Sequence, residues 1–258
     1  MACSLIISGS FAGKATAALL SVTVTVQNLA ASGTNGISFA PLRLGFSNGT
    51  FDSFNNAQTG GAAVVSIAEG GSGSDWFPAF QAAEPNSVRG SVGGALLPGS
   101  TAANTFLVDS DVNQFFTFGT MIIPSNDLFL GNDSPTAFRL FNNGGSSLLL
   151  PSITQRGSAI WDANSEVADP LNAAFVVGGT NSNRTPENGL VAFDFSELAV
   201  FNGVNTAGGY VFSNAGLTGA TDIYRISFSA TAVPEPSSMG LASIAVGLIS
   251  FRRRRKLS

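Results

Sequence analysis

The sequence of 258 residues contains no histidine and only one cysteine, Cys3. The absence of histidine excludes Ser-His-Asp and Cys-His catalytic sites, and it also excludes the usual zinc ligand sets. A single cysteine cannot build an intrachain disulfide framework. The fold must therefore be stabilised by packing, with a metal held by oxygen ligands as the remaining additional source of stability.

Basic residues are scarce outside the C-terminus. The chain has 12 Lys and Arg against 16 Asp and Glu, and five of the basic residues form the run 252–256. The rest of the chain has seven basic residues against sixteen acids, a net charge of −9. Such a surface repels nucleic acid phosphates and attracts cations, so we expect no nucleic acid partner.

Phenylalanine (21) and glycine (30) are abundant, which favours many short strands joined by turns. From Ser21 to Asn28, valine alternates with serine or threonine, a period of two that is typical of a half-buried strand. We expect an all-β protein, an antiparallel β-sandwich over residues 21–232, with one short helix at 64–69. The further strands that we expect are 42–46, 105–108, 115–123, 137–141, 174–177, 189–195 and 223–230.

The stretch 121–133 leads from the apolar strand at 115–123 into a polar turn. Pro124 has no N–H to give a neighbouring strand, so the strand must end there, and the Ser-Asn-Asp run at 125–127 favours a turn. A second acidic segment, Trp-Asp-Ala-Asn-Ser-Glu at 161–166, follows about thirty-five residues later. Two such loops can meet at one end of a sheet.

These acids allow three interpretations. Calcium takes six to eight oxygen ligands from carboxylates, carbonyls and water, all of which two acidic loops can supply. A carboxylate pair, Asp127 with Asp162 or Glu166, is also the arrangement that glycoside hydrolysis uses. The third interpretation is that they are solvated turn residues. Only Trp76 and Trp161 offer indole platforms for sugar rings, and we therefore expect no enzyme.

The two acidic segments resemble the spondin N-terminal domain, whose family carries Met-Ile-Val-Pro-Ser-x-Asp and Trp-Asp-Ala-Gly-Thr-Asp segments. Residues 21–29 and 45–52 are similar to that family's opening strand and to its aromatic, glycine-rich second segment. The resemblance covers residues 21 to about 190. It implies a β-sandwich with the spondin N-terminal, C2-like architecture.

The same resemblance implies a calcium site formed by Asp127, Asp162 and Glu166. Two positions depart from the family pattern. Glu166 stands where the family has aspartate, and its longer side chain could still bind the ion, in bidentate fashion or through a shifted loop. Asn164 stands where the family has glycine.

Residues 233–258 form a three-part tail. Two prolines around a glutamate cannot continue a sheet interior, so the folded body ends there. Residues 237–251 are apolar and uncharged and favour a short helix, but these fifteen residues fall short of the roughly 20 that span a bilayer. The basic run that follows keeps this end on the cytoplasmic side. The candidate sorting residues are Pro234, Glu235, Pro236, Arg252, Arg253, Arg254 and Arg255.

This tail resembles the PEP-CTERM sorting signal of exopolysaccharide-producing bacteria. The resemblance implies that residues 237–251 anchor the chain transiently in the inner membrane and that an exosortase-type membrane protease then removes them. The protein is then expected to be secreted or held at the cell surface. Residues 1–20 are apolar and carry an Ala-Thr-Ala cleavage pattern at 15–17 but no positive start, so we expect a signal peptide with an incomplete beginning.

Together these patterns predict an exported, calcium-binding β-sandwich with a role in adhesion or matrix association. Its expected partner is an extracellular polysaccharide or a surface protein. The role rests on analogy, because fold and export do not determine a ligand. The alternatives are an extracellular carbohydrate-active enzyme and a structural surface protein with no specific ligand.

Overall fold

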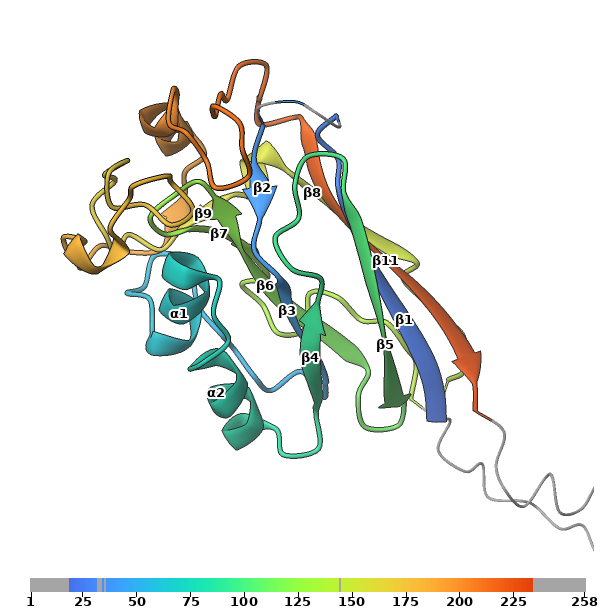
Figure 1. The fold of residues 1–258 in the computed structure, drawn as a ribbon. Helices are drawn as coiled ribbons and strands as arrows, with labels where there is room; N and C mark the ends of the chain where they lie inside the picture. The colour runs from blue at the N-terminus through green and yellow to red at the C-terminus, as the bar shows by residue number, and fades with distance from the viewer. Residues whose placement is uncertain (1–18, 32–33, 35, 144, 234–258) are drawn as a thin grey trace, which may run out of the picture.

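The computed structural model describes residues 19–31, 34, 36–143 and 145–233, which form two antiparallel sheets packed face to face (Figure 1). The expected helix at 237–251 and the candidate sorting residues lie outside the described residues, as do residues 1–18 of the expected signal peptide. In the described part of the chain, no helix combines the length and apolar composition that a membrane span requires.

The first sheet has four strands and contains the strand that the valine alternation predicts. Its first strand begins at Leu19, two residues before the expected boundary, because Leu20 is buried in the core and pairs with Val108 and Ala232 on its two neighbours. In spatial order the strands are β5 (Thr101–Asp109), β1 (Leu19–Asn28), β11 (Asp222–Ala232) and β8 (Ser152–Arg156).

The second sheet is larger and is built around β6 (Phe115–Ile123), which ends one residue before Pro124 as expected. A short strand, β2 (Ser38–Phe39), pairs with the end of β6. The other strands, in spatial order on the two sides of β6, are β10 (Ala192–Phe193), β9 (Trp161–Asp162) and β7 (Leu128–Gly131), then β3 (Leu42–Ser47) and β4 (Val88–Val92).

Aromatic side chains join the two sheets in the core. Phe116 on β6 contacts Phe46 on β3 and Phe228 on β11, with ring centroids 5.5 and 4.9 Å apart in edge-to-face arrangements. Phe39 on β2 packs against Tyr224 on β11 at 4.6 Å. Each of these rings is at most 7 % exposed, so their burial is a main source of the sandwich's stability.

Two helices, α1 (Ala62–Gly70) and α2 (Trp76–Ala83), lie on the outer face of the larger sheet (Figure 1). Glycines on the strands beneath make room for them. A Cβ at Gly45 would lie 2.0 Å from the ring of Phe80, and a Cβ at Gly119 would lie 2.8 Å from Ile67. The larger sheet is therefore covered on both faces, and from Phe116 on every residue of β6 is buried.

The predicted two-sheet, mostly β architecture is confirmed, together with the strands expected at 42–46, 115–123 and 223–230 and the helix expected at 64–69. The helix α2 was not expected from the sequence. It carries Pro78 in its first turn, where a missing N–H costs no helical hydrogen bond. Its buried face is formed by Trp76 and Phe80.

Three expected strands are wrong or too long. The segment 137–141 makes a single bridge to Phe115, and the segment 174–177 makes only isolated bridges. In the latter, Phe175 has φ = 64°, which interrupts an extended strand. The strand expected at 189–195 is only Ala192–Phe193.

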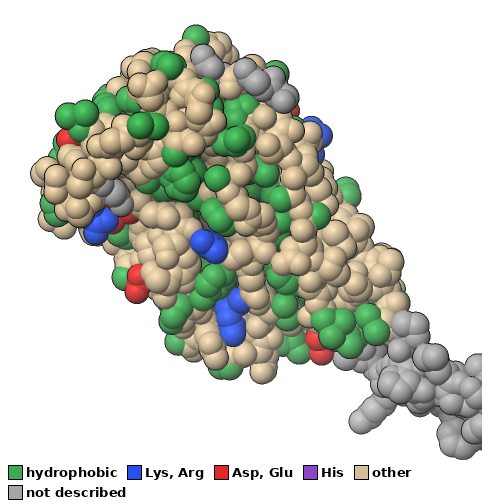
Figure 2. Space-filling model, viewed as in Figure 1, with side chains coloured by type: hydrophobic (Ala, Val, Ile, Leu, Met, Phe, Trp, Pro, Cys, Tyr) green, Lys and Arg blue, Asp and Glu red, His purple; other side chains and the backbone are tan. Residues whose placement is uncertain are grey.

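Charged side chains are few on the molecular surface. Figure 2 shows a face of mainly uncharged polar and apolar atoms, with isolated basic and acidic groups. This agrees with a composition of only 11 % charged residues. A concentration of carboxylates in one place therefore stands out from the rest of the molecule.

Candidate metal site

Three carboxylates from separate segments meet beside the larger sheet. Asp127 lies in the turn between β6 and β7, Asp162 ends β9, and Glu197 lies in the 3-10 helix η3 (Ser196–Phe201). One ligand oxygen from each lies within 4.8 Å of those of the other two. The three side chains are thus close enough to bind one ion together.

Strand pairing brings these segments together. Asp162 on β9 is the register partner of Leu128 on β7, the residue that follows Asp127. On its other side Asp162 pairs with Ala192 on β10, a few residues before Glu197. The site is therefore built at one end of the larger sheet, as the two acidic loops predict, with a third segment added.

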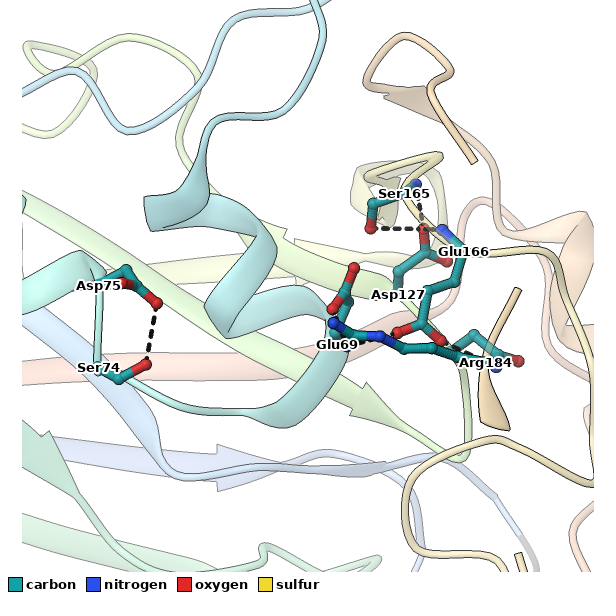
Figure 3. Close-up of polar contacts among 8 residues, drawn as sticks. Glu69, Ser74, Asp75, Asp127, Ser165, Glu166 and Arg184 are labelled. Atoms are coloured by element: carbon teal, nitrogen blue, oxygen red, sulfur yellow. Dashed lines mark hydrogen bonds and ion pairs between the residues drawn. The ribbon is translucent and has the colours of Figure 1, made fainter. Parts of the chain in front are cut away.

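Asp127 is completely buried, and its two oxygens have different surroundings. Its Oδ2 accepts hydrogen bonds from the N–H groups of Ser165 (2.6 Å) and Glu166 (3.0 Å) and from Ser165 Oγ (3.1 Å; Figure 3). Its Oδ1 is buried and has no hydrogen-bond partner. An unpaired buried carboxylate oxygen is costly, and a bound cation is one way to satisfy it.

Glu197 repeats this incomplete pairing, whereas Asp162 does not. Asp162 Oδ1 accepts a hydrogen bond from the N–H of Asn164 at 2.7 Å, and the Glu197 carboxyl group hydrogen-bonds Asp162. Oε1 of Glu197 is buried without a hydrogen-bond partner. The ion pairs found among the described residues involve Arg156 and Arg184, and neither reaches these three carboxylates.

The pKa values show how the site is charged without a cation. Burial raises the pKa of Asp127 to about 6, and the charge of Asp162 adds to this effect, against the lowering by the three donors on Oδ2. Burial raises the pKa of Glu197 to about 9, with further contributions from Asp162 and Asp127. Burial also raises the pKa of Asp162. Without a cation, a proton on Glu197 therefore reduces the negative charge of the site at neutral pH.

Glu166 lies outside this group of ligand oxygens. Its side chain points away from Asp127 towards Arg184 and Glu69 (Figure 3). Its Oε1 accepts a hydrogen bond from Arg184 Nη1 at 2.9 Å, and its Oε2 accepts one from Asn126 Nδ2 at 3.3 Å. Burial raises the pKa of Glu166 to about 7. The structure thus joins Asp127 and Asp162 as expected, but with Glu197 in the third place, while Glu166 contributes its backbone N–H.

Asn164 has a backbone conformation that accounts for its position. It has φ = 48°, in the left-handed region that glycine adopts freely and that asparagine tolerates best among the other residues. Its side chain donates a hydrogen bond to the carbonyl oxygen of Leu190 at 2.9 Å. Asparagine therefore suits the turn between Asp162 and Ser165.

Sequence reasoning missed Glu197 because it lies far along the chain from both acidic segments. The available signal was its position, two residues after the end of the strand expected at 189–195. Asp127 and Asp162 likewise follow or end strands of the same sheet. Only the pairing of β9 between β7 and β10 shows that all three occupy the same end.

The donor set suits calcium. Carboxylate oxygens are hard ligands, and calcium–oxygen distances of about 2.3–2.6 Å allow oxygens on opposite sides of one ion to lie about 5 Å apart. The three carboxylate oxygens lie within 4.8 Å of one another, so they fit within one such shell. Three side chains would leave further positions for carbonyl oxygens or water, as calcium requires.

The comparison with protein families identifies the tail. The PEP-CTERM protein-sorting motif matches residues 232–256, beginning at the last residue of β11. The motif indicates an exported protein that an exosortase, a membrane enzyme, processes, with the cell surface or the extracellular space as its destination. No curated protein matches the chain. The resemblance of the preceding domain to the spondin N-terminal family stays a prediction.

Proposed function

We propose that this protein is an exported β-sandwich of the spondin N-terminal, C2-like type that binds one calcium ion and acts in adhesion or matrix association. Asp127, Asp162 and Glu197 are the proposed ligands. The observation that carries the proposal is the buried, unpaired Oδ1 of Asp127 beside two other carboxylates. A divalent cation would satisfy this oxygen and remove the repulsion among the three groups.

The position of the site supports a role in contacts with the cell's surroundings. β11 ends at Ala232, where the sorting motif begins, and this end of the strand lies at the opposite end of the sandwich from β9 and the 163–201 loops (Figure 1). A protein tethered through its C-terminus would thus present the calcium-bearing loops away from the membrane. An extracellular polysaccharide or a surface protein is the partner class proposed for this end.

Burial of the carboxylates argues against the alternative of a carbohydrate-active enzyme. Asp127 is 0 % and Asp162 is 5 % exposed, so a glycosidic bond cannot reach both in the described conformation. Glycoside hydrolysis requires two carboxyl groups on either side of the scissile bond. A structural, non-enzymatic role for the three acids is therefore favoured.

Calcium titration of the full chain by calorimetry tests the metal assignment. We expect one site per chain in the wild type, strong weakening in Asp127→Asn, and no change in Asp75→Asn. Asp75 is an exposed acid whose carboxylate bonds Ser74 and lies outside the cluster (Figure 3). Magnesium should compete poorly, because it prefers a smaller, near-octahedral shell. Equal calcium binding by Asp127→Asn and the wild type would contradict the proposal.

The intact mass of the secreted protein tests the sorting step. We expect processing near Pro234-Glu235-Pro236, so the mature protein should lack the arginine run. Replacement of that motif by alanines should leave the tail attached. Recovery of residues 252–258 on mature extracellular protein would contradict processing.

A further inference from the structure

Arg184 links the loop beside the proposed calcium site to a helix on the outer face of the sheet. Its Nη1 donates to Glu166 Oε1 at 2.9 Å and also pairs with Glu69 in α1 (Figure 3). The side chain of Glu166 is 1 % exposed and that of Glu69 is 10 % exposed. One guanidinium group therefore holds two buried carboxylates together.

The same loop makes the contacts that orient Asp127. The N–H groups of Ser165 and Glu166 both donate to Asp127 Oδ2, which fixes the carboxylate and leaves Oδ1 without a hydrogen-bond partner. Glu166 thus uses its backbone for Asp127 and its side chain for Arg184. A shift of Glu166 away from α1 would pull its N–H away from Asp127.

The chain beyond the loop reinforces this arrangement. Val167 N–H donates to the carbonyl oxygen of Thr185 at 2.9 Å, and Glu187 N–H donates to that of Ser165 at 2.7 Å. The segments 165–167 and 185–187 therefore run side by side, with Arg184 next to their junction. Arg184 joins these two segments to α1 through its ion pair with Glu69.

We propose that Arg184 is a positioning residue for the calcium site, which holds the 165–166 backbone against Asp127 by pairing with Glu166 and Glu69. This inference rests on the proposed function. Removal of the guanidinium group leaves two buried carboxyl groups without their counter-charge and removes the contact that holds Glu166 against α1. Groups that orient metal ligands typically change metal affinity by about 10–100-fold when they are mutated.

The direction of the effect separates positioning from simple electrostatics. Removal of a positive charge close to the site strengthens cation binding if charge alone matters. Loss of the orientation of Asp127 weakens it. We expect Arg184→Met to bind calcium about 10–100-fold more weakly than the wild type. Arg184→Lys keeps the charge and one donor nitrogen, and Nη1 alone makes both contacts in the wild type, so its affinity should stay closer to the wild type's than that of Arg184→Met.

Calorimetric titration of the full-length variants with calcium measures this effect, with Arg156→Met as the matched control. Arg156 is likewise in an ion pair, with Asp222, but both side chains are exposed and belong to the other sheet. The calcium affinity of Arg156→Met should equal that of the wild type. Should Arg184→Met fail to fold, Arg184→Gln, which also removes the charge, takes its place, and an affinity equal to the wild type's would overturn the proposal.

Hydrogen exchange in the calcium-free protein tests whether Arg184 holds the 165–166 backbone in place when no metal is bound. The amides of Ser165 and Glu166 should exchange faster in Arg184→Met than in the wild type or in Arg156→Met. If the wild type binds no calcium, the proposed function fails and the effect on affinity fails with it. If the wild type binds calcium and Arg184→Met binds it as tightly or more tightly, the positioning role alone is wrong.

Discussion

The body of the sandwich and the loop region 163–221 are held together in different ways. In the body, long strands such as β1 and β11 pair over most of their length and bury alternate side chains. In the loop region the regular elements are the two residues of β10 and short 3-10 turns. Eight of the twelve exposed large hydrophobic side chains among the described residues lie in this region. Apolar burial therefore stabilises it less than it stabilises the body.

Polar contacts take the place of apolar burial in the loop region. Asp127 accepts three hydrogen bonds from residues 165–166, and Arg184 joins Glu166 to Glu69. Such contacts depend on charge, protonation and bound ions, whereas apolar burial does not. We therefore expect solution conditions to act on the loop region and core substitutions to act on the body.

The largest effect should come from the core of the body. Phe116→Ala removes a fully buried ring that contacts both sheets and should lower the free energy of unfolding by about 3–5 kcal/mol. For a domain of this size that is a fall of roughly 6–20 °C in Tm, measured by thermal unfolding. Phe193→Ala is the matched change in the loop region, where the ring is 55 % exposed and stacks on Trp161. A loss there as large as in the core would remove the contrast between the regions.

Calcium should have the next largest effect. An ion bound only by the folded state at about one hundred times its Kd adds roughly 2.7 kcal/mol, or about 5–11 °C in Tm. Thermal unfolding in calcium and in chelator measures the difference. Asp162→Asn should shrink this difference, whereas Phe116→Ala should lower both Tm values and preserve it. An unchanged Tm in chelator would return the three acids to a purely structural role.

In the absence of calcium, pH should also change the stability, because protons then reduce the negative charge of the three acids in place of the ion. The folded-state pKa values of Asp127 (about 6) and Glu197 (about 9) are raised from 3.8 and 4.5. Between its unfolded and folded pKa values, each group binds more protons in the folded protein than in the unfolded chain. The stability that the two groups contribute is therefore complete below about pH 4 and is lost as the pH rises through 6 and then 9.

Urea unfolding at pH 5, 7 and 9 in chelator measures this dependence. The midpoint should fall as pH rises, and saturating calcium should reduce the fall because it replaces the protons. The same series on Glu197→Gln should lose the part of the slope between pH 7 and 9. A midpoint that rises with pH in the metal-free wild type would contradict the charge state assigned to the site.

The smallest effect should come from an ion pair on the body. Asp222→Asn breaks the pair with Arg156, whose side chains are 63 % and 46 % exposed. Exposed pairs contribute about 0–1 kcal/mol, so chemical unfolding should show little change. Glu69→Gln, which alters the pair between Arg184 and the buried Glu69, should cost more. Equal losses in the two variants would show that burial does not distinguish these pairs.

The sequence predicted the body better than the loop region. The period-two pattern of valines identifies β1, and the apolar run before Pro124 identifies β6 with its end. Both signals are local, because alternation and the missing proline N–H act within a few residues. The expected strands at 137–141 and 174–177 failed because both segments have irregular backbone with isolated bridges. Leu140 and Phe141 are buried in the core without a regular strand, whereas Phe175 and Val177 are exposed.

By itself, the sequence determined the absence of histidine chemistry, the two-sheet β class, the sorting tail, and two of the three carboxylates that meet. Tertiary structure decided the third. Asp127 and Asp162 lie in recognisable local patterns, whereas Glu197 reaches them only because β9 pairs with both β7 and β10. Tertiary structure also decided the place of Glu166, since the direction of its side chain depends on Arg184 and Glu69. Contacts between distant segments are set by strand pairing and packing, which residue spacing along the chain does not encode.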